Sequence, residues 1–239
     1  MKPKITKEQI VKVLEGFDIS PTLTKKDIAK GIETVRKYGF YGVVANPYRV
    51  AYFKGLLKGT EIKLIGVVGF PLGATLPEVK AMEAKLCVEK GADELDMVIN
   101  IGALKDGDYD LVRYDMEAVV KAAKGRPVKA IIETALLTDE EKVKACQLAK
   151  EAGVAYIKTC TGFGGEATVH DVELIKRTVG DALKVKGSFG YASAGRTSYN
   201  LEDVLRFIDA GADKIGVRIE LDGPAILEGF DRWHKWLAP

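Results

Sequence analysis

The feature that most limits how this chain can fold is a repeated unit, made of an amphipathic helix, a glycine at its end and a short apolar run. Four copies place the glycine at Gly39, Gly91, Gly153 and Gly211. Glycine suits the left-handed backbone position that ends a helix. In the third copy, Thr138 and Glu141 have the spacing of a capping box, which marks the start of a helix. We therefore predict helices at residues 24–38, about 76–90, 138–152 and about 201–210.

The apolar runs are short and rich in Val and Ile, as expected of strands that are buried on both faces. Seven are predicted, at residues 40–45, 62–68, 93–99, 128–133, 154–159, 183–186 and 212–217. Strands that alternate with helices imply a parallel sheet. A closed (β/α)8 TIM barrel needs an eighth strand, and the weak run 16–20 is the candidate. The alternative is a doubly wound open sheet, but no Gly-x-Gly-x-x-Gly follows the first strand, so we predict an α/β fold of the barrel type.

Length and charge narrow the class of protein. A chain of 239 residues fits one barrel domain, residues 1–239. The formal net charge of +2 gives no strong field for nucleic acid or an anionic membrane. Three cysteines without CxxC spacing and two histidines argue against a zinc site and against a disulfide framework, so no metal is expected. The first residues have no apolar run typical of a signal peptide, and we expect a cytoplasmic location.

Ionisable side chains inside the predicted strands are the most informative departure from the pattern. They are Asp96, Lys129, Lys158 and Lys186. A buried charge is costly unless it is paired. A structural explanation is that some of them form buried ion pairs, such as Lys129 with Glu133, or that the strand register turns them towards the helix layer. A functional explanation is that they lie near the carboxyl ends of neighbouring strands, where the active sites of barrels are found.

Lysines close to an aspartate fit one particular chemistry. A lysine must be neutral to attack a carbonyl group, and both burial and a nearby second cation lower the pKa of its ammonium group. An aspartate within reach, directly or through water, can move the protons that the reaction needs. The residues alone do not decide which lysine is the nucleophile.

Four segments of the sequence resemble the deoxyribose-phosphate aldolase family of class I aldolases. They are residues 69–75, 91–104, 128–134 and 156–163, and the similarity extends from about residue 24 to residue 216. The resemblance implies a (β/α)8 barrel in which Lys158 forms the Schiff base, Lys186 is the second lysine and Asp96 assists proton transfer. Lys129 also matches a lysine of the family, in a supporting network.

The departures from the family lie mainly in the loops that would bind the substrate phosphate. The family's opening motif is replaced around residues 17–21, several residues are inserted in 187–195, and Arg218-Ile219 replaces a Ser-Ser pair. The loops after the last two strands of a barrel are its usual phosphate site. Arg218 is expected either to bind an anion through its planar fork or to point outward and pair with Glu220. The candidate substrate- and phosphate-binding residues are Thr161, Gly162, Gly195, Gly216 and Arg218.

The resemblance implies reversible cleavage of 2-deoxyribose 5-phosphate to acetaldehyde and glyceraldehyde 3-phosphate, without metal or organic cofactor. The first alternative is the same lysine chemistry on an unphosphorylated or differently charged aldehyde. The second is a catalytically silent barrel that serves as a binding protein or scaffold. The expected partner is a small aldehyde or sugar phosphate. No nucleic acid or membrane is expected to bind, and assembly of the chain into a homo-oligomer stays open.

Overall fold

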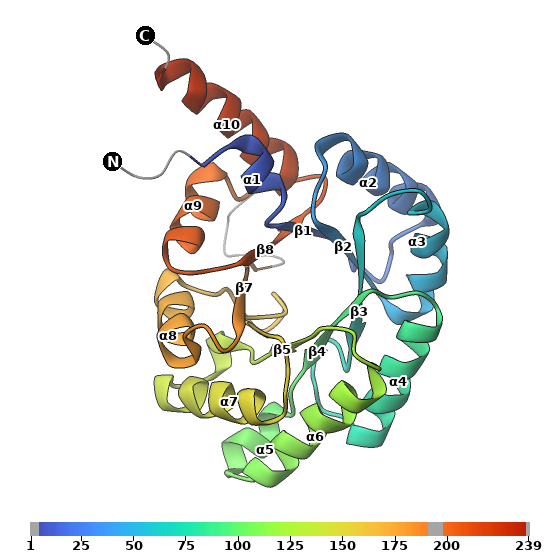
Figure 1. Ribbon diagram of the computed structural model, residues 1–239, viewed down its shortest axis with the longest axis vertical. Helices are drawn as coiled ribbons and strands as arrows, with labels where there is room; N and C mark the ends of the chain where they lie inside the picture. The colour runs from blue at the N-terminus through green and yellow to red at the C-terminus, as the bar shows by residue number, and fades with distance from the viewer. Residues whose placement is uncertain (1–4, 191–197, 238–239) are drawn as a thin grey trace.

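A closed barrel of eight parallel strands lies at the centre of the computed structural model, and helices surround it (Figure 1). The structure describes residues 5–190 and 198–237, and of residues 232–237 the backbone alone. The strands follow chain order around the barrel, and β1 pairs with both β2 and β8. They are β1 (Leu14–Phe17), β2 (Gly42–Ala45), β3 (Lys63–Val68), β4 (Glu94–Val98), β5 (Val128–Ile131), β6 (Tyr156–Lys158), β7 (Lys184–Ser188) and β8 (Lys214–Arg218).

The helices alternate with the strands, so the predicted TIM-barrel class is confirmed and the open sheet is excluded. They are α1 (Lys7–Val11), α2 (Lys25–Tyr38), α3 (Val50–Leu56), α4 (Pro77–Glu89), α5 (Ile101–Asp106), α6 (Tyr109–Ala122), α7 (Asp139–Glu151), α8 (Val169–Val179), α9 (Leu201–Asp209) and α10 (Asp222–Leu237). Two 3-10 turns, η1 (Pro47–Arg49) and η2 (Thr134–Leu136), follow β2 and β5. None of the helices in the described ranges is long and apolar enough to span a membrane.

Local signals in the sequence explain where the helices begin and end. The capping box predicted at Thr138 and Glu141 is formed, and α7 begins at the next residue, Asp139. Gly39 ends α2 in the left-handed conformation, with φ of 74°, which a residue with a side chain adopts only at a cost. These helix boundaries confirm the predictions to within about one residue.

The eighth strand begins two residues earlier than predicted and ends sooner, at Leu14–Phe17 instead of 16–20. All four of its residues are buried, and its register sets Leu14 beside Ile215 and Phe17 beside Arg218. The charged side chain of Glu15 interrupts the apolar run, which is why the sequence pattern of this strand is weak.

The two faces of each strand pack against different surroundings. The main apolar core fills the space between the barrel and the helices, and alternate strand residues such as Leu95, Met97, Ile157 and Val185 belong to it. A second, smaller apolar cluster belongs to strands and loops at one side of the barrel interior, and consists of Phe17, Ile19, Val44, Ile65 and Val67. The strand residues that alternate with the outer core therefore face the inside of the barrel.

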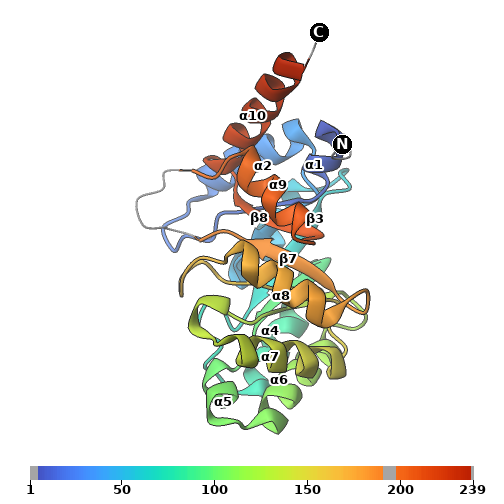
Figure 2. The ribbon, with the colours of Figure 1, turned by 90° about the vertical axis from the view of Figure 1, so that its left-hand side faces the viewer.

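Helices α1 and α10, at the two ends of the chain, are in contact with each other. Lys7 on α1 forms an ion pair with Asp231 on α10, with 2.7 Å between Nζ and Oδ1. Figure 2 shows α10 extending beyond the ring of helices, next to α1.

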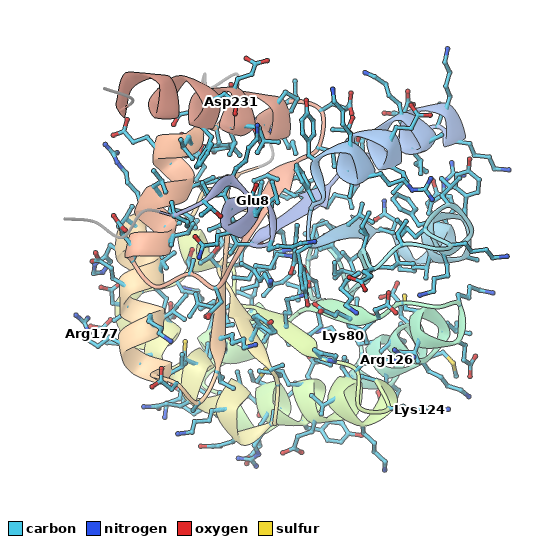
Figure 3. The ribbon with its side chains drawn as sticks, turned by 45° about the horizontal axis from the view of Figure 1, so that its top comes forward. Glu8, Lys80, Lys124, Arg126, Arg177 and Asp231 are labelled. Carbon is cyan, nitrogen blue, oxygen red and sulfur yellow. The ribbon has the colours of Figure 1, made fainter. Side chains whose placement is uncertain are left out.

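A buried ion pair joins α4 and α6 to the end of β4. The Nζ of Lys80 lies 2.5 Å from Oδ2 of Asp115, and both side chains are 0% exposed. The same Nζ donates a hydrogen bond to the carbonyl of Val98, at 2.8 Å. In Figure 3, Lys80 lies on the inner side of α4, whereas Arg177 points away from the body of the protein. Burial lowers the pKa of Lys80 and raises that of Asp115, although each charge opposes the shift of the other.

We predict that Lys80→Met lowers the free energy of unfolding by about 3–5 kcal/mol, because it leaves Asp115 charged and buried without its partner. The double variant Lys80→Met/Asp115→Leu is expected to recover most of this loss, because it removes both charges. Urea unfolding followed by circular dichroism measures the difference. A double variant as unstable as the single one contradicts the explanation.

Candidate active site

Six ionisable side chains meet inside the barrel. Three are carboxylates and three are lysines, and each side chain is at most 6% exposed. They come from β1, β4, β5, β6 and β7, and are Glu15, Glu94, Asp96, Lys129, Lys158 and Lys186. The strand register explains the grouping, because Asp96 is the pairing partner of Lys129 and Lys158 that of Lys186.

Asp96 is the centre of this group. Its Oδ1 accepts a hydrogen bond from Nζ of Lys129 at 3.1 Å. Its Oδ2 accepts from Nζ of both Lys158, at 2.9 Å, and Lys186, at 2.7 Å. The structure thus brings together the three residues that the sequence predicted as a catalytic set. The possibility that the strand register turns these side chains towards the helices is excluded, because they face the interior.

Glu15 and Glu94 complete the group and were missed from the sequence. Glu94 binds Nζ of Lys129 at 2.6 Å and accepts a hydrogen bond from the hydroxyl of Tyr41 at 2.5 Å. Glu15 reaches from β1 to Nζ of Lys186 and lies 3.5 Å from Nζ of Lys129. The signal for both was present, because each carries a charge within or next to a short apolar run. Glu15 was missed because β1 was expected to begin one residue after it.

The arrangement shifts the pKa values of its members in different directions. Burial alone would raise the pKa of Asp96, but the three lysines outweigh it and hold that pKa well below its ordinary range. Burial disfavours the charged form of Lys129 as well, yet Asp96, Glu15 and Glu94 raise its pKa well above that of a normal lysine. Lys129 is therefore a permanent cation.

Lys158 is the exception among the lysines. Burial lowers the pKa of Lys158, and the charge of Lys186 lowers it further, against the opposing effect of Asp96. Among the residues that the structure describes, Lys158 makes one ion pair with a carboxylate, whereas Lys129 makes three and Lys186 two. Its side chain is 6% exposed, while those of the other two lysines are 0% exposed. The electrostatic environment thus favours a neutral amine at Lys158 more than it would at Lys129.

The predicted ion pair between Lys129 and Glu133 is wrong. Residues four apart in a strand lie about 13 Å from each other along its axis, too far for a direct contact. Glu133 instead has a left-handed backbone with φ of 58° and binds the loop after β6. Both of its carboxylate oxygens accept from the amide of Thr161 at 3.2 Å, and its Oε2 also accepts from the Thr161 hydroxyl. Burial raises the pKa of Glu133, and the hydrogen bonds from Thr161 oppose this shift.

The residues expected to bind substrate phosphate are spread over β8 and the loops that follow β6 and β7. Thr161 is tied to Glu133, and the next residue, Gly162, has a positive φ of 88°. Gly216 lies on β8, where a Cβ atom would come within 2.9 Å of the Ser188 hydroxyl. Gly195 lies outside the residues that the structure describes, as does most of the segment 187–195.

Arg218 binds a carboxylate with both sides of its guanidinium fork. Nη2 lies 2.7 Å from Oδ1 and Nε 3.0 Å from Oδ2 of Asp222, the first residue of α10. Glu220, the partner considered from the sequence, binds Lys30 and Thr34 instead, each at 2.6 Å. The reason is geometric: Asp222 starts the helix and also accepts from the Arg218 amide at 2.8 Å, so it lies directly beside the end of β8.

Comparison with known proteins places this site in a family. The chain is 52% identical over 225 residues to the deoxyribose-phosphate aldolase of Thermococcus gammatolerans, covering 92% of this chain and 96% of the relative. It is 49% identical over 221 residues to that of Staphylococcus epidermidis, with the same shares covered. The chain belongs to the deoxyribose-phosphate aldolase family. Members of this family are class I aldolases, which are lyases, and the chain is an aldolase of this kind.

Solved structures agree with this family assignment. An aldolase named QR15 superposes with a TM-score of 0.86 at 34% identity, covering 96% of this chain and 99% of its own. The tetrameric deoxyribose phosphate aldolase of Aeropyrum pernix superposes with a TM-score of 0.84 at 28% identity, covering 95% of this chain and 93% of its own. No protein-family model matches the chain. The predicted family is thus confirmed by individual relatives.

Proposed function

We propose that this aldolase cleaves 2-deoxyribose 5-phosphate reversibly to acetaldehyde and glyceraldehyde 3-phosphate, through a Schiff base on Lys158. The observation that carries the proposal is the shared carboxylate oxygen of Asp96, which holds Lys158 at 2.9 Å and Lys186 at 2.7 Å. A second ammonium group that close makes protonation of the first unfavourable, so Lys158 is the lysine prepared to be a neutral nucleophile.

In the direction of cleavage, neutral Lys158 attacks the aldehyde carbon of the sugar and gives a carbinolamine. Loss of water converts it to a protonated Schiff base. A base then removes the proton of the C3 hydroxyl, the C2–C3 bond breaks, and glyceraldehyde 3-phosphate leaves. The electron pair of that bond remains as an enamine on Lys158. Protonation at C2 and hydrolysis of the imine release acetaldehyde and restore the amine.

Asp96 and Lys186 have different roles in this sequence. The low pKa of Asp96 keeps it ionised, so it accepts protons through an intervening water molecule instead of donating its own. The charge of Lys186 lowers the pKa of Lys158, and its ammonium group stabilises oxyanions that form at the substrate carbonyl. Lys129 and Glu94, which are paired with each other, hold Asp96 in position from the deeper side of the barrel.

The phosphate group is proposed to bind at the carboxyl ends of the last strands, with Thr161, Gly162, Gly195, Gly216 and Arg218 as candidates. Arg218 brings a fixed positive charge to the end of β8. Its fork is bound to Asp222, and this carboxylate reduces the charge that a phosphate would meet.

We also propose that the chain assembles with copies of itself. The support is that the related aldolase of Aeropyrum pernix is tetrameric.

Reduction of the enzyme with borohydride in the presence of acetaldehyde is expected to leave a two-carbon adduct on Lys158, detected by peptide mass spectrometry. Lys158→Ala is expected to give no adduct and to lose at least about 10³-fold in kcat, because no covalent intermediate can form. An adduct on Lys186 or Lys129 in the wild-type enzyme contradicts the assignment of the nucleophile.

The acid limb of the kcat/KM profile is expected to lie below the ordinary lysine range of about pH 10.4, because the pKa of Lys158 is lowered. Lys186→Met removes the neighbouring cation and leaves Asp96 to stabilise the Lys158 ammonium group. The pKa of Lys158 then rises, and the acid limb moves to higher pH. Lys186→Arg keeps the charge and is the matched control. An unmoved limb in a folded Lys186→Met variant refutes the electrostatic role of Lys186.

Cleavage rates of 2-deoxyribose 5-phosphate and of 2-deoxyribose test the phosphate site. We expect kcat/KM to be at least about 100-fold higher for the phosphorylated sugar, because two or more hydrogen bonds to a charged group contribute about 3 kcal/mol or more. Equal values for the two sugars show that phosphate is not recognised, while the Schiff-base chemistry stands.

A further inference from the structure

Helix α4 buries a charged side chain on its inner face and exposes apolar side chains on its outer face, the opposite of an ordinary helix on a protein surface. Its inner face buries Lys80 together with Ala84 and Cys87. Its outer face exposes Val79 (51%), Met82 (53%) and Leu86 (44%). A helix on a soluble barrel normally turns its apolar stripe to the core. The buried ion pair of Lys80 with Asp115 accounts for the inner face but leaves the apolar outer stripe without a structural reason.

The stripe is the ridge of a larger apolar surface. The loop before α4 adds Leu72 and Leu76, which are 73% and 65% exposed. A hollow of about 520 Å³ lies on one side of the ridge, against Pro47 and Tyr48 of η1. A second hollow of about 660 Å³ lies on the other side, against Tyr114 and Ala118 of α6. A ridge between two grooves is the shape into which another helix packs.

We propose that this surface, the α4 face, binds α4 of a second copy of this chain in an antiparallel, twofold-symmetric contact. The spacing of Val79, Met82 and Leu86 is three and then four residues, which is the seam of a pair of packed helices. A twofold contact buries the same surface on both copies and must therefore be complementary to itself.

The charges beside the seam meet this requirement. Glu78 and Lys85 are both exposed and lie seven residues apart, on the same side of the helix. A twofold axis midway between them sets Glu78 of each copy opposite Lys85 of the other. A parallel contact would instead set equal charges against each other at both positions.

The composition of the surface also separates a second copy from a lipid surface. Helices that lie on membranes carry an excess of Lys and Arg beside the apolar stripe. Beside the seam of α4, Glu78 and Glu89 are matched by Lys85 and Lys90. Met and Tyr, which contribute Met82, Tyr48 and Tyr114 here, are enriched in protein interfaces.

The α4 face is on the outside of the helix ring, between α3 and α6 (Figure 1). It is thus separate from the ionic group inside the barrel. The inference rests on the proposed self-association and names the surface that makes it, while catalysis by Lys158 is independent of it.

Sedimentation velocity across a range of protein concentrations tests the surface. We expect the wild-type chain to self-associate, and Met82→Glu to weaken this at least tenfold in dissociation constant, because it puts a charge into an apolar seam. Met82 is half exposed, so the variant is expected to fold and to keep its aldolase activity per chain within about twofold. Tyr109→Glu, at an exposed position at the start of α6, is the control and is expected to associate as the wild type does.

A charge exchange tests the antiparallel arrangement. Glu78→Lys alone sets two lysines opposite each other and is expected to weaken association at least fivefold, and adding Lys85→Glu is expected to restore it. Glu78 also accepts a hydrogen bond from the Tyr114 hydroxyl, at 3.5 Å. Tyr114→Phe removes that bond without changing the charge and is expected to leave association unchanged.

The outcomes that overturn the proposal are distinct. Self-association that Met82→Glu leaves unchanged refutes the α4 face, while the proposed assembly stands. Failure of the double charge exchange to restore association refutes the antiparallel contact. A wild-type chain that remains monomeric at all concentrations refutes both the surface and the assembly, and an adduct on Lys158 in that monomer leaves the catalytic proposal intact.

Discussion

The carboxylate of Asp96 is the interaction on which the interior of this barrel depends. Three lysines from three consecutive strands donate hydrogen bonds to its two oxygens. Three ammonium groups cannot lie inside a barrel unless negative charges lie between them. Glu15 and Glu94 supply the remaining negative charge, and each also reaches Lys129. The placement of Lys158, the proposed nucleophile, is therefore a property of the whole group and not of β6 alone.

The interior is divided between two kinds of packing. Phe17, Val44, Ile65 and Val67 form an apolar wall from β1 to β3, and the ionic group occupies β4 to β7, with Glu15 added from β1. The apolar wall excludes water from the ions on one side, which strengthens their mutual interactions. Burial is also the largest single cause of the lowered pKa of Lys158. The same apolar residues that close the barrel thus favour the neutral form of Lys158.

The fold could be predicted from the sequence because its signals are local. Capping residues such as Thr138, glycines such as Gly39 and short Val- and Ile-rich runs each act over a few residues. The charges within those runs also identified Asp96, Lys158 and Lys186 as a possible group. The contacts that the sequence did not predict depend on how residues far apart in the chain approach each other. Glu15 contacts a residue 171 positions away, and no pattern along the sequence shows that approach. The partners of Glu133 and Arg218 were missed for the same reason, because turns after β5 and β8 redirect these side chains.

The balance of three carboxylates and three lysines has a consequence for the covalent intermediate. With Lys158 neutral and ready to react, the interior holds three negative charges and two positive ones. If Lys158 forms the Schiff base as proposed, the iminium ion carries a positive charge at the same position and completes the balance. The barrel is then electrostatically matched to the enzyme with substrate attached, whereas the neutral amine leaves it one positive charge short. Such an interior acts as a counter-ion built in advance for an ion that exists only during turnover.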